Sequence, residues 1–129
     1  MAYISKSQAT RRTFDITKRS QQFDLSGSST TEYLHTAEND LSIRLIRAIY
    51  EETTSADAGV GIRIGKMNFP DYFASFTSAI STSRGVISTV IKFDNRQFLL
   101  ADETLIVECD GGKTGAGAVS IQIEMEGYR

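Results

Sequence analysis

The 129-residue sequence contains no tryptophan and only one cysteine, one proline and one histidine. A single cysteine, Cys109, excludes an internal disulfide framework. A single histidine, His35, has no second histidine or neighbouring cysteine with which to build a familiar zinc site or catalytic triad. We therefore interpret His35 as a polar strand residue at the surface and predict no metal and no cofactor.

Long apolar runs are also absent. None approaches the roughly 18 residues of a membrane-spanning helix, and the N-terminus lacks the apolar core of a signal peptide. We therefore predict no membrane partner and synthesis in a reducing cytoplasm. The chain is 40% hydrophobic and 23% charged, as is ordinary for one globular domain. Its net charge of −2 gives no general attraction to nucleic acid.

Charge is unevenly distributed along the chain. Residues 1–22 hold five basic residues against one acidic residue, a net charge of +4, which leaves −6 for the remainder. The same segment is rich in Ser, Thr and Gln, a composition typical of an arm. We predict an extended basic arm over 1–22 and a domain over 23–129. The arm is either a floppy terminus or a segment that becomes ordered on an acidic partner.

Most of the domain shows the alternation of apolar and polar residues that predicts β-strands. A helix over 40–52 is the alternative to a strand there, but clustered Ile and Tyr favour the strand. A change of apolar phase after Leu45 indicates a bulge or a strand buried on both sides. Residues 71–77 form either a helical turn or an irregular strand. The other predicted strands are 30–36, 60–66, 86–93, 97–100, 105–109 and 119–125, with a tight turn at 94–96.

About eight short strands with frequent turn signals predict an all-β fold, an antiparallel β-sandwich of jelly-roll type. The stretch Gly-Gly-Lys-Thr-Gly-Ala-Gly at 111–117 raises the alternative of a phosphate-binding loop. That loop needs a glycine where Val107 stands and a helix after it, whereas residues 119–125 alternate like a strand. The glycines therefore indicate a turn between strands.

Catalytic patterns are scarce. Cys109 shares an apolar strand phase with its neighbours, and buried thiols behave as small hydrophobes. Glu124 and Glu126 share one strand face, a geometry open to a paired-acid mechanism, but a solvated face is the preferred interpretation. An aromatic platform for a sugar could come only from the cluster Tyr72, Phe73 and Phe76. The preferred interpretation of this cluster is a hydrophobic plug that covers an edge of the sandwich, or a contact surface.

The order of segments from Glu32 to Tyr128 resembles the small β-sandwich decoration, or cement, proteins of tailed-phage capsids. The similarity is greatest over Ala101–Gly112, followed by Gly115, Gly117 and the strand Val119–Tyr128. It covers about three-quarters of the chain. The resemblance implies a non-enzymatic virion protein on the capsid exterior, assembled in the host cytoplasm, that ties neighbouring major capsid subunits together as a symmetric oligomer.

Three functions stay open at this point. The first is this capsid-binding role, with a tail or head-completion subunit as a variant and a trimer, or else a dimer, as the expected oligomer. The second is a ligand-binding module for sugars, and the third is a small enzyme that uses the paired glutamates. For the first, the predicted partner-binding residues are Arg11, Arg12, Phe14, Ile16, Lys18, Arg19, Phe23, Tyr72, Phe73 and Phe76.

Overall fold

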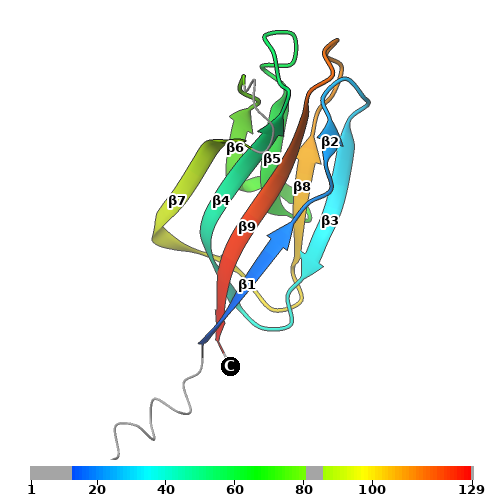
Figure 1. The fold of residues 1–129 in the computed structure, drawn as a ribbon. Helices are drawn as coiled ribbons and strands as arrows, with labels where there is room; N and C mark the ends of the chain where they lie inside the picture. The colour runs from blue at the N-terminus through cyan, green and yellow to red at the C-terminus, as the bar shows by residue number, and fades with distance from the viewer. Residues whose placement is uncertain (1–12, 81–85, 129) are drawn as a thin grey trace, which may run out of the picture.

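The structure is a computed structural model that describes residues 13–80 and 86–128. Among the described residues, the regular elements are all β-strands, joined by loops and turns (Figure 1). Among them, no helix is long and apolar enough to cross a membrane. The strands are β1 (Thr13–Arg19), β2 (Phe23–Asp24), β3 (Thr30–Thr36), β4 (Leu41–Glu51), β5 (Gly61–Lys66), β6 (Phe69–Thr77), β7 (Val86–Leu99), β8 (Thr104–Cys109) and β9 (Ala118–Tyr128).

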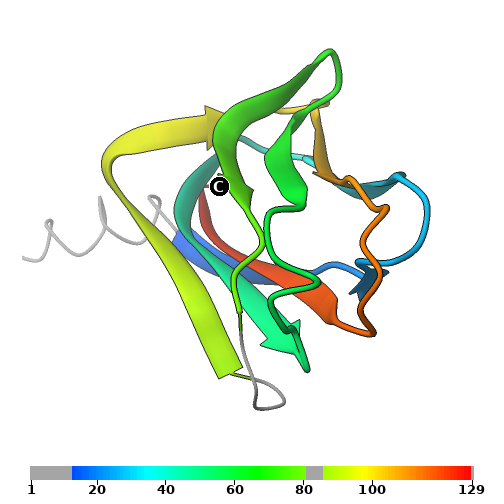
Figure 2. The same cartoon turned by 90° about the horizontal axis from the view of Figure 1, so that it is seen from above.

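The strands build two antiparallel sheets that face each other (Figure 2). One sheet has the order β1-β9-β4-β7, with β2 also paired to β9, and the other has the order β3-β8-β5-β6. If β1 and β2 count as one interrupted strand, the first strand pairs with the last, the second with the seventh, the third with the sixth and the fourth with the fifth. This nested pairing is that of a jelly roll. The predicted all-β sandwich is confirmed.

The core fills the space between the sheets. Burying each large aliphatic side chain contributes about 1.5–3 kcal/mol, so the contact between the sheets supplies most of the stability. The largest side chains less than 2% exposed are Tyr50, Leu25, Leu41, Ile43, Ile46, Ile62, Ile64, Leu99, Leu105, Ile121, Ile123 and Met125.

Loops and turns gather at the two ends of the sandwich (Figure 1). One end, called the loop end, carries the segments 25–29, 52–60 and 110–117. The other end, called the turn end, carries the turns 37–40, 67–68 and 100–103 together with the described N- and C-termini.

Strand β4 replaces the alternative helix over 40–52. Its pairing with β7 shifts register between Ile43 and Leu45, and again between Ala48 and Ile49. Leu45 and Ile49 are each 8% exposed although they lie outside the main core cluster. Both interpretations of the phase change, a bulge and burial on both sides, are therefore confirmed.

The tight turn predicted at 94–96 is wrong. Strand β7 continues through these residues from Val86 to Leu99, so the two strands predicted at 86–93 and 97–100 are one. On β4, Ile43 and Leu45 are two residues apart, but their β7 partners Gln97 and Lys92 are five apart. The turn-forming residues thus make a bulge, because β4 offers a continuous partner on both sides of them.

The predicted boundary between arm and domain lies after residue 22, but the sandwich already begins at Thr13. Strand β1 pairs with β9 from Thr13 opposite Tyr128 to Arg19 opposite Gln122. Phe14 and Ile16 pack against the core. The apolar side chains of these two predicted partner-binding residues therefore have contacts within the chain itself. Residues 1–12 of the predicted arm lie outside the described residues.

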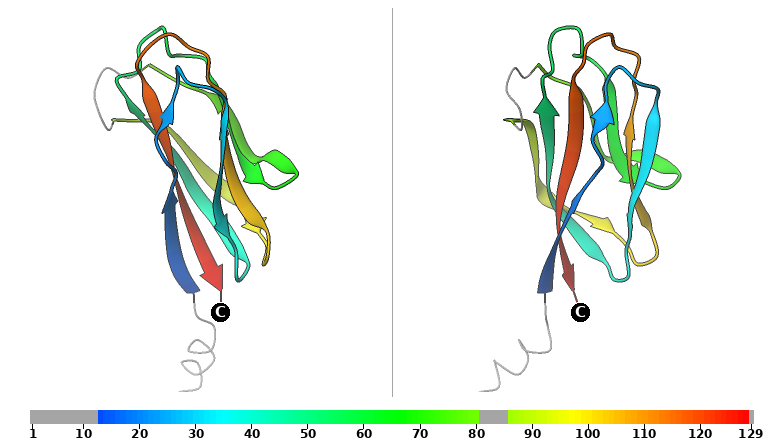
Figure 3. Two further views of the ribbon diagram at one scale, coloured as in Figure 1. Left: turned by 90° about the vertical axis from the view of Figure 1, so that its right-hand side faces the viewer. Right: turned by 45° about the vertical axis from the view of Figure 1, so that its right-hand side comes forward.

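The hairpin of β5 and β6 projects from its sheet (Figure 3). Ile64 pairs with Ala74 and Lys66 pairs with Phe69, so β6 has several extra residues between the two pairs. Pro70 lies in this irregular part, where β6 is the edge strand and a missing N–H is tolerated. Residues 71–77 are thus the irregular strand, and the helical turn is excluded.

Candidate partner-binding surfaces

Of the four predicted partner-binding residues that are basic, the structure describes two, Lys18 and Arg19. Arg11 and Arg12 lie outside the described residues. On β1, Lys18 is half-buried, and Arg19 donates from Nε and Nη2 to the Ser120 hydroxyl at 3.2 and 2.9 Å.

The apolar members of this predicted set face the interior of the sandwich or its margin. Phe14 and Ile16 on β1 pack against the core, and Phe23 on β2 is only 3% exposed. Their side chains are therefore engaged by the core of the same molecule. Phe23 is therefore closed to a partner, whereas Phe14 and Ile16 are half-buried like Lys18, and Arg19 is exposed.

The aromatic cluster on β6 is divided in the same way. Tyr72 is 49% exposed, whereas Phe73 is 7% exposed and Phe76 packs against the core. The rings of Tyr72 and Phe73 meet edge to face, with centroids 5.1 Å apart. Phe73 and Phe76 thus anchor the edge strand, and of these three residues Tyr72 presents its ring to a partner.

Two exposed apolar residues of the hairpin were not predicted from the sequence. Met67 is 49% exposed and Phe69 is 58% exposed. Phe69 contacts Tyr72 edge to face, with the ring centroids 6.4 Å apart. The signal available in the sequence is the turn Met67-Asn68, because apolar side chains beside a hairpin turn have little sheet to cover them.

A cleft of about 320 Å³ lies between this hairpin and the turn 100–103. We call it the hairpin cleft. Met67 and Phe69 form its apolar wall, and Asp102 and Glu103 form its acidic wall. Asp102 has a φ of 72°, a left-handed conformation that Asp and Asn tolerate better than most residues. The cleft is lined by Lys66, Met67, Asn68, Phe69, Asp102, Glu103 and Thr104.

Lys66 is tied into the floor of the hairpin cleft. Its Nζ lies 2.8 Å from Oε2 of Glu103 and 4.1 Å from the centre of the Tyr72 ring. Glu103 also accepts a 2.7 Å hydrogen bond from the backbone N–H of Leu100. The bond from Lys66, followed by that from Leu100, lowers the pKa of Glu103 against the opposing effect of burial. The positive charge of Lys66 is therefore already compensated inside the protein.

The glycine-rich segment 111–117, at the loop end, packs against the buried carboxylate of Asp57. Asp57 is fully buried and accepts hydrogen bonds from the backbone N–H groups of Thr54 at 2.9 Å and Gly117 at 3.3 Å. A Cβ on Gly115 would collide with the carboxylate of Asp57. Strand β9, not a helix, follows the segment. These glycines permit close approach between two loops, in agreement with the predicted turn.

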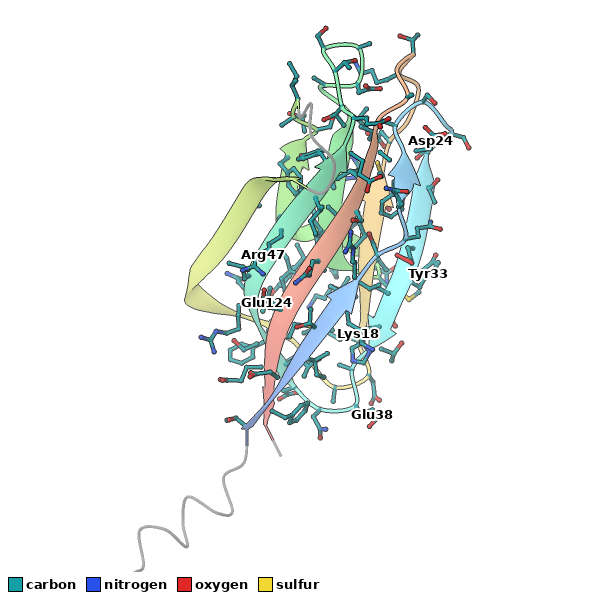
Figure 4. The ribbon with its side chains drawn as sticks, in the orientation of Figure 1. Lys18, Asp24, Tyr33, Glu38, Arg47 and Glu124 are labelled. Atoms are coloured by element: carbon teal, nitrogen blue, oxygen red, sulfur yellow. The ribbon has the colours of Figure 1, made fainter. Side chains whose placement is uncertain are left out.

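The paired glutamates of β9 are engaged in ion pairs on the outer face of their sheet. Glu124 binds Arg47, as Figure 4 shows, and Oε2 of Glu126 lies 3.1 Å from Nη1 of Arg44. These cross-strand pairs cover the polar face of the sheet.

The opposite sheet carries a comparable network. Arg63 bridges Glu108 at 2.9 Å and Asp110 at 2.8 Å. The hydrogen bonds from Arg63 lower the pKa of Asp110. Cross-strand ion pairs therefore lie on the outer faces of both sheets.

His35 and Cys109 occupy different surroundings. His35 lines a small cavity of about 70 Å³ with Phe14, Ile16 and Glu38. Burial, and after it the charge of Lys18, lowers the pKa of His35. Burial raises the pKa of the Cys109 thiol to about 11. Within the described part of the chain, no group of three or more His, Cys, Asp or Glu residues could hold a metal ion.

Comparison with known proteins identifies a similar fold but does not assign the chain to a family. No protein-family model and no curated protein matches the sequence. Among solved structures, the chain is similar to one from the acidic stable capsid structure of Helicobacter pylori bacteriophage KHP30, with a TM-score of 0.61 and 6% identity. The match covers 89% of this chain and 91% of that chain. At this identity the likeness concerns the fold.

Proposed function

We propose that this protein is a structural component of a phage virion that binds the outer surface of the capsid and cements neighbouring major capsid subunits. The observation that carries the proposal is the fold match to a chain of a phage capsid structure over nearly the full length of both chains. A fold alone does not define a function, so the surface features are needed as well.

Two surface features support a role based on contact. The hairpin cleft and the exposed rings of Phe69 and Tyr72 offer an apolar surface on a projecting element. The sheet faces carry ion pairs such as Arg63 with Glu108 and Asp110. A protein that binds two subunits at once stabilises their assembly by mass action. The major capsid protein is the proposed partner, and a trimer, or else a dimer, is the proposed oligomer.

The other functions receive less support. A sugar-binding platform of Tyr72, Phe73 and Phe76 is disfavoured, because Phe73 is buried and Phe76 packs against the core. An enzyme with the two β9 glutamates as its acid pair would first have to release both carboxylates from their arginine partners on β4. A tail or head-completion subunit also needs a surface for contact with other virion proteins. Only its location in the particle distinguishes it from a cement protein.

The proposal is tested by adding the purified protein to particles of the phage that encodes it, prepared without this protein. We expect saturable co-sedimentation with the particles and an increase in the temperature at which the shells release their DNA. A protein that stays in the supernatant, or binds shells with no effect on their heat resistance, would refute cementing. Binding confined to tails would instead support the tail subunit.

A further inference from the structure

Strand β1 forms one edge of its sheet (Figure 1). Within the described part of the chain, it pairs with β9 on one side and with no strand on the other. Its seven positions pair without a bulge and include no proline. Such an edge offers backbone N–H and C=O groups to a further strand, and proteins often protect it with a bulge or a proline. The edge strand β6, by contrast, is irregular around Pro70.

The outer face of β1 carries two opposite charges. Asp15, Thr17 and Arg19 are exposed, and no described side chain forms an ion pair with Asp15 or Arg19. These two residues do not meet within one chain, because four residues of strand separate their Cα atoms by about 13 Å. Arg19 instead donates to the hydroxyl of Ser120.

Asp15 lies beside a second carboxylate. Its partner on β9 is Glu126, and like charges directly opposite each other in a sheet are destabilising. Glu126 has its own cation, because its Oε2 lies 3.1 Å from Nη1 of Arg44 on the β4 side. A cation brought to the free edge of β1 would therefore compensate Asp15, which has none within the described part of its own chain.

The spacing of these charges makes the edge complementary to a second copy of itself. If two β1 strands pair antiparallel about a two-fold axis at Thr17, Asp15 of each copy lies opposite Arg19 of the other. Residues directly opposite share one face of the sheet, with Cβ atoms about 4.5–5.5 Å apart, so two reciprocal ion pairs form. On the inner face, Ile16 of each copy lies opposite Lys18 of the other, whose methylene groups can cover it.

We propose that β1 is the surface through which a second copy of this chain binds, as a two-fold dimer with one continuous sheet across both molecules. A second copy is favoured over a different protein because this short edge supplies both halves of each ion pair. The contact is complete with two copies. The inference stands without the proposed function, but it selects the dimer from the two oligomers considered there.

The test reverses the two charges separately in the full-length protein and measures molecular mass by sedimentation from about 5 µM to about 0.5 mM. Asp15→Arg gives each copy two cations on this face, and Arg19→Asp gives it two anions, so each variant repels itself. An equal mixture of the two variants restores both ion pairs. Asp71→Arg, at an exposed position on β6, is the matched control for the change in charge. Thermal melting of each protein verifies that it is folded.

We expect the wild type and Asp71→Arg to dimerise, each β1 variant alone to dimerise at least about tenfold more weakly, and the mixture to form a heterodimer. A wild type that is monomeric throughout this range, or trimeric, would overturn the proposal. So would a dimer that Asp15→Arg and Arg19→Asp leave unchanged, or a mixture that fails to associate. Because no capsid is present, these outcomes are independent of binding to the particle.

Discussion

At the scale of single residues, the carboxylate of Asp57 restricts position 115 to glycine. The missing side chain leaves space for Asp57, which is buried and joins the loop 52–60 to the segment 110–117. A residue of any other type at position 115 would push the carboxylate of Asp57 out of its hydrogen bonds with Thr54 and Gly117.

We therefore predict that Gly115→Ala lowers the free energy of unfolding by about 2–4 kcal/mol. Gly112→Ala is the matched control. Gly112 has a φ of 91°, but a Cβ added there would meet no atom within 4 Å, so only the backbone preference is lost, at about 1–2 kcal/mol. Urea denaturation measures both values. A loss for Gly115→Ala no larger than that for Gly112→Ala would contradict the crowding by Asp57.

His35 gives a pH dependence with a defined sign. The pKa of His35 is lowered from 6.5 by burial, then by Lys18, while Glu38 opposes the change. The unfolded chain therefore binds the proton more tightly than the folded protein. Stability due to neutral His35 is complete above pH 6.5 and is lost as the pH falls through the folded-state pKa.

The corresponding measurement compares melting temperatures of the wild type and His35→Gln from about pH 8 to pH 5. We expect the wild type to lose more stability than the variant over this range, since glutamine does not titrate. Parallel curves for the two proteins would show that His35 is equally solvated in both states.

Cys109 is predicted to be a slow thiol. Its pKa is raised to about 11 by burial first and by Asp110 second, and only the thiolate reacts. We expect labelling by a disulfide reagent at neutral pH to be at least about tenfold slower than in urea-unfolded protein. Equal labelling rates for the folded and the unfolded protein would show that the end of β8 that carries Cys109 opens readily.

At the scale of elements, strand β1 belongs to the sandwich and not to an arm. It covers one side of β9 over seven paired positions and places Phe14 and Ile16 against the core. Removing residues 1–12 is therefore expected to leave the melting temperature nearly unchanged, whereas removing 1–22 should cost at least about 3 kcal/mol of stability. Circular dichroism melts of the two truncated proteins measure this difference. Equal stability would show that β1 contributes little.

The sequence predicts the central strands of the sheets well, but not the edge strand β1. Strands β5 and β9 follow from alternation, because one face of each is buried by the opposite sheet. Strand β4 is buried on both sides, and the clustered Ile and Tyr residues were needed to favour a strand over a helix. The local composition of β1 is polar and basic, and it therefore predicts an arm. Its partner β9 lies about a hundred residues away in the chain, as the bond from Arg19 to Ser120 illustrates, and no local pattern reports such a pairing.

The candidate surface is less predictable than the fold for a related reason. Extra residues in β6 between the pairs Ile64–Ala74 and Lys66–Phe69 shift the strand's phase. The shift turns Tyr72 outward and Phe73 inward, which the order of residues alone does not determine. The hairpin cleft also requires two turns that are separate in the sequence, 67–68 and 100–103, to lie side by side.

At the scale of the whole molecule, exposed apolar side chains are most concentrated on the projecting hairpin, where Met67, Phe69 and Tyr72 lie. Tyr33, Ile80 and Leu100 are exposed singly elsewhere, and the outer faces of both sheets carry cross-strand ion pairs. Such a body is suited to contact at its turn end and hairpin.

If that surface binds the capsid, Phe69→Ser should weaken binding to particles by roughly tenfold, as loss of a central aromatic contact does. Tyr33→Ser, at a 65% exposed position on β3, is the matched control in the same co-sedimentation assay. Equal binding by the two variants would remove the hairpin from the capsid contact.

The most direct test of the central claim is a cryo-electron microscopy map of the complete phage particle. We predict density for this jelly roll on the outside of the shell, in contact with at least two neighbouring major capsid subunits. A map in which the shell surface is fully accounted for by other proteins, with the jelly roll absent or located only in the tail, would contradict the account.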